Sequence, residues 1–206
     1  MKKVVVLQVH LEEGAEEEED APKLKTEVAI DASRSIIARN NSPDIPFDRS
    51  INPYRGCEHG CVYCFARPSH AFLGLSPGLD FEARLFAKPE AARLLEAELS
   101  RPSYRCQVLA MGTNTDPYQP LEKEHRITRS ILEVLLEYRH PFSIVTKSAL
   151  VVRDLDILSE AAAMGLGRVA LSVTTLDHRL SRLMEPRAST PKRRLWAIER
   201  LSEAVS

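Results

Sequence analysis

The fold is decided by residues 142–174, which read FSIVTKSALVVRDLDILSEAAAMGLGRVALSVT. The stretch begins and ends with short apolar runs, Phe142–Thr146 and Val169–Thr174, which are typical of buried strands. The residues between them predict a helix that begins at Asp154 and stops near Gly165. Two strands joined by a crossover helix predict a parallel pair, because parallel neighbours cannot be joined by a tight turn.

The same alternation recurs on both sides of this stretch. Further strands are predicted near Ile51–Tyr54 and over Cys106–Met111. Four strands that are each followed by a helix predict an α/β fold with a parallel sheet that helices bury on both faces. The other three helices are marked by Pro89 with Leu94, Leu95 and Leu99, by Thr128 with Ile131, Leu132 and Leu135, and by the cap Thr190-Pro191 with Leu195, Ile198 and Leu201.

Charge is distributed unevenly along the chain. The 206 residues include 28 basic and 29 acidic side chains, a net charge of −1, and 44% are hydrophobic, which is typical of a folded domain. The first 20 residues hold two lysines and seven acids, so the rest carries 26 basic and 22 acidic residues, a net charge of +4. A mildly basic body is compatible with a nucleic-acid partner without requiring one.

The chain is expected to have two parts. Residues 1–27 are predicted to be an acidic, disordered leader, and residues 28–206 to be the folded domain. The residues from Pro22 to Pro46 contain scattered prolines and turn formers, and they predict an ordered approach segment without regular elements. No apolar run reaches the roughly 20 residues that cross a bilayer, and no signal peptide is recognisable, so we expect a cytoplasmic protein without a membrane partner.

Three of the four cysteines lie close together. Cys57, Cys61 and Cys64 have the spacing C-x3-C-x2-C within one short loop. In a protein expected in the cytoplasm, such clustering favours metal or redox chemistry over disulfides. Dense thiolates select zinc or an iron–sulfur cluster. Three ligands favour a cubane cluster with one open iron, whereas zinc stays an alternative if His59 or His70 supplies a fourth ligand.

The cysteine loop and two later motifs resemble one protein family. The loop reads Asn52-Pro53-Tyr54-Arg55-Gly56-Cys57-Glu58-His59-Gly60-Cys61-Val62-Tyr63-Cys64, and the later motifs read Gly112-Thr113-Asn114-Thr115-Asp116-Pro117-Tyr118-Gln119-Pro120 and Thr146-Lys147-Ser148. In this order they are similar to the radical S-adenosylmethionine (SAM) superfamily, and in particular to its spore-photoproduct-lyase-like branch. The resemblance covers roughly residues 27 to 203, and it implies a partial TIM-type barrel.

The resemblance also implies cofactors and their ligands. Cys57, Cys61 and Cys64 would bind three irons of a [4Fe-4S] cluster, and the fourth iron would bind SAM. The reduced cluster would cleave SAM to a 5′-deoxyadenosyl radical that abstracts hydrogen from an unknown substrate. An electron donor such as flavodoxin or ferredoxin is then expected as a partner. Analogy with the lyase branch suggests a nucleic-acid lesion as the substrate.

Five further residues are expected to contact SAM on the same resemblance. Tyr63 matches the aromatic residue near the adenine, and Thr113 and Asn114 stand where the family has a Gly-Gly-Glu motif, from which this chain departs. Lys147 follows a predicted strand and would meet the cofactor carboxylate. Ser172 follows the next strand and would reach the ribose hydroxyls or the carboxylate.

Other polar residues near these motifs have plainer interpretations. Asp116 before Pro117 is typical of a turn former, and Arg55 is expected to pair with Glu58. Cys106 lies in an apolar run and is expected to be a buried, unreactive thiol. His59 is expected to shape the loop or to hydrogen-bond a sulfur. Glu185–Arg187 is expected to be either a solvent turn or an active-site loop. Lys192–Arg194 is expected to be a solvated helix face.

Two alternatives to an active enzyme stay open. The first is a zinc or iron–sulfur binding module without turnover. The second is an inactive fragment, because the family's barrel has six βα units and the sequence predicts four, with an open sheet edge after Val169–Thr174. We therefore expect a C-terminally incomplete core that is poorly active and prone to aggregation.

Overall fold

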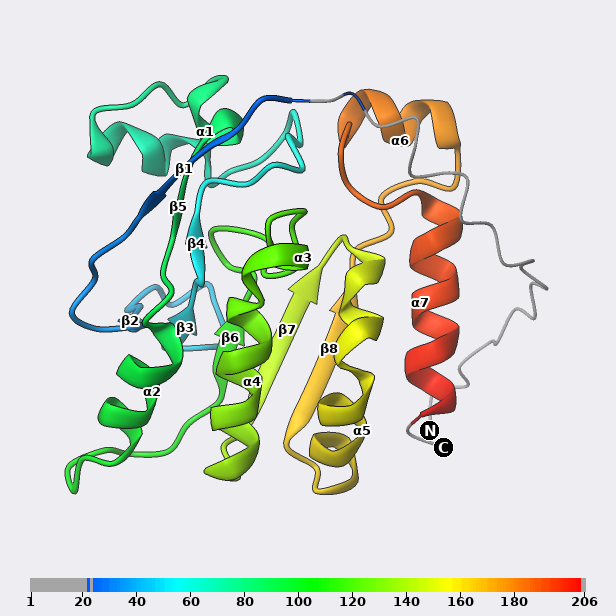
Figure 1. Cartoon of the computed structure of the whole chain (residues 1–206). Coiled ribbons are helices and arrows are strands. Elements are labelled where there is room, and N and C mark those ends of the chain that lie inside the picture. Colours follow the sequence, from blue (N-terminus) through cyan, green and yellow to red (C-terminus); the bar gives the residue numbers. More distant parts are fainter. Residues whose placement is uncertain (1–21, 23, 205–206) are drawn as a thin grey trace.

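A computed structural model describes residues 22 and 24–204, which form two sheets with helices on one face of the larger sheet (Figure 1). The larger sheet has the strand order β2-β3-β6-β7-β8. Strands β3, β6, β7 and β8 are parallel neighbours, and β2 pairs antiparallel with β3. The predicted four-stranded parallel sheet is therefore confirmed. The strand bounds are β2 Ile37–Arg39, β3 Arg49–Ile51, β6 Leu109–Met111, β7 Phe142–Thr146 and β8 Gly167–Leu171.

The four predicted helices are present, and each follows its strand. Their bounds are α2 Ala91–Leu99, α4 Ile127–Glu137, α5 Leu155–Ala163 and α7 Pro191–Glu203. The predicted cap of α7 is confirmed, because the Thr190 hydroxyl accepts a hydrogen bond from the Arg193 N–H at 3.3 Å. At the other end of α5, Gly165 adopts a left-handed φ of 70°, as a helix stop requires.

Helices cover only one face of the larger sheet. Phe142, Ile144 and Thr146 of β7 are buried, whereas Val145 on the opposite face is 45% exposed. The side chains of β8 are half-buried or exposed along its whole length. The expectation that both faces are buried is therefore wrong for the described residues. The buried face packs against α2, α4 and α5, whose apolar stripes include Leu95, Ile131, Leu132 and Leu158.

The approach segment forms strands that the sequence did not predict. β1 (Glu27–Ile30) runs parallel to β5 (Arg84–Ala87), and β4 (Tyr54–Arg55) pairs antiparallel with β5 to complete a second, three-stranded sheet. The expectation of no regular element between Pro22 and Pro46 is therefore wrong at β1 and β2. β1 begins at the last residue of the predicted leader. Residues 1–21 and 23 lie outside the described residues, so the leader stays a prediction.

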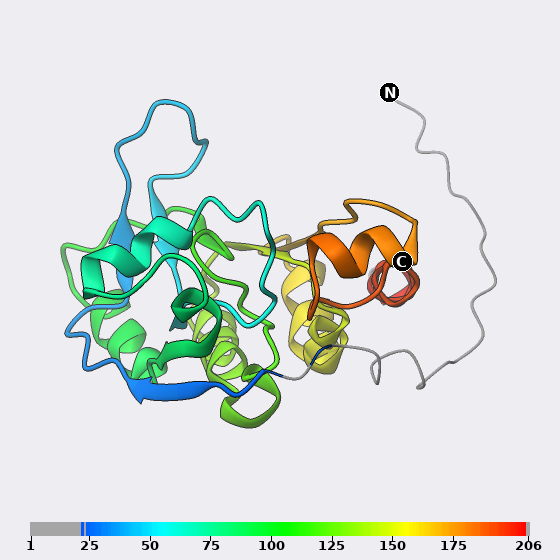
Figure 2. The same ribbon diagram turned by 90° about the horizontal axis from the view of Figure 1, so that it is seen from above.

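Short elements gather at the carboxyl ends of the parallel strands. Viewed from above, η2 and α6 lie on opposite sides of this end (Figure 2). In the part of the chain that the structure describes, no helix is long and apolar enough to cross a membrane. The remaining bounds are η2 Arg67–Leu73, α1 Asp80–Ala83, α3 Glu122–His125, η3 Ala149–Asp154 and α6 His178–Met184.

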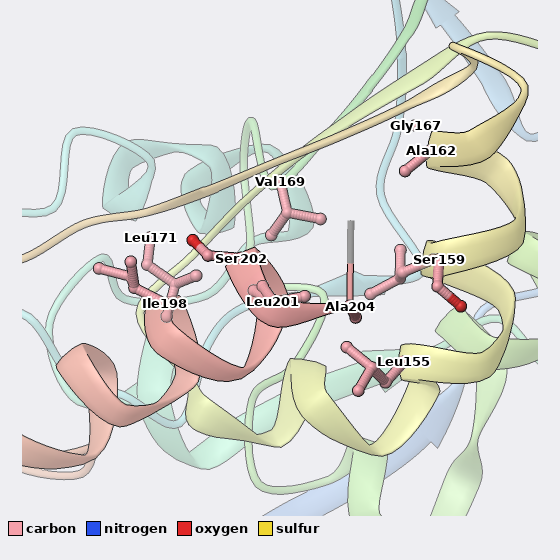
Figure 3. A pocket seen from close by; sticks show the side chains of 11 residues that line it. Leu155, Ser159, Ala162, Gly167, Val169, Leu171, Ile198, Leu201, Ser202 and Ala204 are labelled. Atoms are coloured by element: carbon pink, nitrogen blue, oxygen red, sulfur yellow. The ribbon is translucent and has the colours of Figure 1, made fainter. Parts of the chain in front are cut away.

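Strand β8 stands at an edge of the sheet. Among the described residues it pairs with β7 alone, which agrees with the open edge that the sequence predicts. Between α5, β8 and α7 lies an apolar pocket of about 490 Å³ (Figure 3). Its lining includes Leu155, Val169, Leu171, Ile198 and Leu201.

Two expectations about single residues are wrong. Cys106 is exposed and lies before β6 begins, so it is not a buried strand thiol. Arg55 forms its ion pair with Asp31 at 2.5 Å instead of with Glu58. Both expectations rest on residues that are close in the chain. The fold instead exposes Cys106 to solvent and brings Asp31, which follows the distant strand β1, next to Arg55.

Gly112 allows β6 and β7 to approach each other closely where both strands end. Its φ is +90°, and a Cβ at this position would stand 2.0 Å from the carbonyl oxygen of Val145. We therefore expect Gly112→Ala to lower the free energy of unfolding, measured by denaturant titration, by more than the about 1–2 kcal/mol of a left-handed L-residue alone. Gly74→Ala is the matched control, because its φ is +70° and nothing lies within 4 Å of the added Cβ. Equal losses in both variants would contradict the close approach.

Candidate functional site

The three clustered cysteines line one pocket at the carboxyl ends of β6 and β7. Cys57 is buried, Cys61 and Cys64 are half-buried, and all three are free thiols. The pocket is also lined by the segment Gly112–Asp116, which follows β6, and by Lys147, which follows β7. The structure therefore brings together the three motifs that the sequence singled out.

The cysteine loop begins at a glycine that touches its surroundings closely. Gly56 has a φ of +78°, and a Cβ there would stand 2.7 Å from the Phe81 carbonyl oxygen. The next amide, that of Cys57, donates a hydrogen bond to the same Phe81 oxygen at 2.9 Å. A larger residue at position 56 would push the loop away from this anchor.

Two side chains that follow β6 hold the same part of the loop. The Gly56 carbonyl oxygen accepts hydrogen bonds from the Thr115 hydroxyl at 2.6 Å and from the Gln119 side-chain amide at 3.3 Å. The Gln119 side-chain oxygen accepts a third bond from the Glu58 N–H at 2.9 Å. Thr115 and Gln119 are thus loop-holding residues that the sequence analysis missed, although both lie in a motif that it quoted.

Two arginines hold the middle of the loop. The Arg67 guanidinium donates to the carbonyl oxygens of Gly60 and Cys61 at 3.1 and 2.9 Å, and it pairs with Glu82 at 2.6 Å. The Arg187 backbone amide donates to the His59 carbonyl oxygen at 3.2 Å, and its side chain bonds Glu82. Of the two interpretations left open for Glu185–Arg187, the solvent turn is wrong, because this segment contacts the cysteine loop and Glu185 is buried.

Thr113 and Asn114 are fixed by an asparagine at the end of β3. The Asn52 side-chain oxygen accepts from the Asn114 N–H at 3.0 Å and from the Thr113 hydroxyl at 3.2 Å. The Asn114 side chain lies in an exposed position, whereas the Thr113 hydroxyl is already engaged by Asn52. Asn114 is therefore freer than Thr113 to contact a ligand.

Tyr63 stands between two charged residues. Its hydroxyl hydrogen-bonds Glu185, and the Lys147 ammonium lies 5.7 Å from its ring centroid. Glu185 is 1% exposed, and burial alone would raise its pKa, but hydrogen bonds from Thr174, Tyr63 and Arg194 lower it below the ordinary value. Glu185 therefore keeps its charge in the folded chain and holds Tyr63 beside the cysteines.

Two predicted site residues, Tyr63 and Ser172, do not line the thiol pocket, and Ser172 is bonded through its backbone. Its backbone amide donates to the Thr146 carbonyl oxygen at 2.9 Å, and its carbonyl oxygen accepts from Arg194 at 2.8 Å. Arg194 is only 1% exposed and pairs with the buried Glu185. The expectation of a solvated face at Lys192–Arg194 is therefore wrong for Arg194, because α7 turns this side chain toward the strand ends.

The surroundings of Cys61 and Cys64 disfavour the negatively charged thiolate forms of these residues. Burial raises the pKa of Cys61 to about 12, helped by the neighbouring Cys57, while the positive charge of Lys147 opposes the rise. Burial also raises the pKa of Cys64. Three thiolates therefore need a positively charged partner to be stable here together.

Comparison with known proteins identifies the family. The model of the radical SAM superfamily matches residues 51–206, which include the cysteine loop and the parallel strands β6, β7 and β8. The chain belongs to the radical SAM superfamily. An uncharacterised protein of Mycobacterium tuberculosis (strain H37Rv) is 42% identical to this radical SAM chain over 164 residues, which are 80% of this chain and 48% of that protein.

Two other similar proteins are also matched by this radical SAM chain over about half of their length. An uncharacterised protein of Methanocaldococcus jannaschii is 28% identical over 153 residues, 74% of this chain and 54% of that protein. A spore photoproduct lyase variant with bound AdoMet and dinucleoside spore photoproduct has the same fold, with a TM-score of 0.56 and 17% identity over 86% of this chain and 47% of that chain. This fold is a partial TIM-type barrel, and the chain spans about half the length of these relatives.

The donor set of this radical SAM chain consists of three free thiols that line one pocket. Within the described residues, no group of three or more His, Cys, Asp or Glu side chains is arranged to hold a metal ion. A zinc ion needs four ligands within about 2.0–2.3 Å, whereas the three thiolates of a cubane cluster each bind a different iron. The His70 Nε2–H donates to the Arg84 carbonyl oxygen at 2.9 Å, and His59 faces Asp116 at 3.3 Å, so both proposed fourth ligands are otherwise engaged.

The buried pair Glu185–Arg194 is expected to stabilise this end of the barrel. Their side chains are 0% and 1% exposed, so Arg194→Met leaves a buried carboxylate without its cation. We expect the free energy of unfolding to fall by about 3–5 kcal/mol at neutral pH. The control is Arg200→Met on the same helix, whose partner Glu203 is 56% exposed, with an expected loss of at most about 1 kcal/mol.

The stability that Arg194→Met loses should depend on pH in a defined direction. Because the pKa of Glu185 is lowered in the folded chain, its contribution is present above the ordinary carboxyl pKa of 4.5 and is lost as the pH falls through the folded value. The difference between the wild-type chain and Arg194→Met should therefore narrow in acid. A difference that is constant from pH 7 to pH 3 would show that the ion pair is not its cause.

Proposed function

We propose that this chain binds a [4Fe-4S] cluster through Cys57, Cys61 and Cys64 and cleaves SAM reductively. When bound, the reduced cluster supplies one electron that splits SAM into methionine and a 5′-deoxyadenosyl radical, which takes a hydrogen atom from the substrate. The observation that carries this proposal is the shared pocket, in which three free thiols meet the polar ends of β6 and β7. Membership of the radical SAM superfamily supports it.

The pocket suggests which side chains receive SAM. The Lys147 ammonium lies beside the thiols and carries the charge that a carboxylate needs. Tyr63 is 45% exposed and is held by Glu185, so its ring offers a surface for the adenine. Asn114 supplies an exposed amide, whereas Thr113 acts mainly by fixing the loop through Asn52. The pocket lends no support to the predicted contact of Ser172.

The same proposal includes two partners. The electron comes from a small redox protein such as flavodoxin or ferredoxin, because reductive cleavage of SAM consumes one electron that a donor must supply. The substrate is a nucleic-acid lesion. Phe65 and Phe72 support this substrate, because their side chains are 79% and 92% exposed and lie in the loop and the short helix that follow the cysteines. Exposed aromatic rings are the surfaces on which single-stranded bases stack.

Iron binding is the first test of this proposal. After anaerobic reconstitution with iron and sulfide, we expect about four irons per chain and the charge-transfer absorption of thiolate-bound iron. Cys61→Ala should lose both, because the pocket then keeps two thiols. Cys106→Ala is the matched control, since this exposed thiol does not line the pocket, and it should bind iron like the wild type. Stoichiometric zinc in place of iron would contradict the proposal.

Cleavage of SAM is the second test. With dithionite and SAM, the reconstituted chain should release 5′-deoxyadenosine, which liquid chromatography measures, and Cys61→Ala should release none. An ultraviolet-irradiated oligonucleotide should increase the yield if the substrate is a nucleic-acid lesion. A chain that retains iron but forms no 5′-deoxyadenosine would be a binding module without turnover.

A further inference from the structure

One buried carboxylate connects the cysteine loop to the ends of two strands. Asp116 is 9% exposed, and one of its oxygens accepts from the Thr146 hydroxyl at 2.7 Å and from the Tyr118 N–H at 2.9 Å. The other oxygen accepts from the Lys147 N–H at 2.8 Å and faces the His59 Nδ1 at 3.3 Å. Four groups therefore meet at a single side chain.

These contacts exceed what a turn requires. Only the bond from Tyr118, two residues along the chain, is the local bond that an aspartate makes before Pro117. The bonds from Thr146 and Lys147 come from residues 30 and 31 positions away, at the end of β7. The interpretation of Asp116 as a simple turn former therefore misses most of its contacts.

Asp116 contacts two basic residues that line the thiol pocket. The His59 side chain is 3% exposed, faces Asp116, and lines the pocket together with Cys57, two residues before it. The Lys147 side chain lines the same pocket, and its positive charge acts on Cys61 and Cys64. One carboxylate therefore contacts both basic residues, through the His59 ring and the Lys147 backbone.

We propose that Asp116 is a positioning residue for the cluster, which holds His59 beside Cys57 and fixes the backbone of Lys147 at the end of β7. This inference rests on the proposed cluster, and it adds a residue that binds neither iron nor SAM. Groups that orient metal ligands through hydrogen bonds typically change metal affinity by 10- to 100-fold when they are removed. Asp116 would act in this way through His59, which lies two residues from Cys57, and through the backbone of Lys147.

The test replaces Asp116 by its isosteric amide. In the reconstituted full chain, we expect Asp116→Asn to weaken iron retention against a chelator roughly 10- to 100-fold relative to the wild type. Asp154→Asn is the matched control, because Asp154 is 0% exposed and pairs with Arg129 and Arg153 away from the thiol pocket. The control should lose stability but retain iron like the wild type.

A double-mutant cycle tests whether Asp116 acts through His59. If it does, His59→Ala and Asp116→Asn together should weaken iron retention no more than the stronger single variant. The reduction potential of the bound cluster is a second measure, because hydrogen bonds to cluster sulfurs shift it, and both single variants should shift it in the same direction. Fully additive losses, or wild-type iron retention in Asp116→Asn, would overturn the proposal.

The positioning role can also be measured without iron. In the cluster-free chain, Asp116→Asn should speed hydrogen exchange at the amides of Lys147 and of residues 57–61, whereas Asp154→Asn should not. Unchanged exchange at these amides would overturn the positioning role even if the chain binds iron. Faster exchange in Asp116→Asn together with a wild-type chain that takes up no iron would instead contradict the proposed function alone.

Discussion

The carbonyl oxygen of Gly56 accepts hydrogen bonds from Thr115 and Gln119, and the geometry of the site depends on this attachment. A loop that carries three cysteines has few apolar side chains to bury, and its apolar packing is a small cluster of Cys57, Ala66 and Phe81. Bonds from residues that follow the sheet strands add to this packing and order the loop. Because Thr115 and Gln119 follow β6 directly, the parallel sheet determines where the thiols lie.

The parallel strands are stabilised differently along their length and at their carboxyl ends. Along the strands, β6 and β7 bury apolar side chains beneath α2, α4 and α5. At the carboxyl ends, buried charges replace them, among which are Asp116, Glu185 and Arg194. A buried charge is costly unless it is paired and hydrogen-bonded, and each of these three has a partner. Loss of one partner should therefore harm this end of the barrel more than loss of a surface charge.

Much of the fold could be predicted, because its signals are local. The bounds of β7 were predicted to the residue, and the caps of α7 and α5 were visible as Thr190 and Gly165. Strands β1, β2, β4 and β5 were missed, because they have two to four residues each and are recognisable only from the segments with which they pair. A short strand has no periodicity of its own, and only its partner shows that it exists.

The sequence by itself determined the order of strands and helices and the three cysteines that share a loop, because hydrophobic periodicity and residue spacing act over a few positions. Tertiary structure alone decided which polar groups surround the thiols. Asp116 and Glu185 each bond residues that lie far away in the chain, and their contacts follow from strand register and helix direction. Register is a property of paired strands, so no single stretch of sequence could show that one carboxylate would hold both His59 and Lys147.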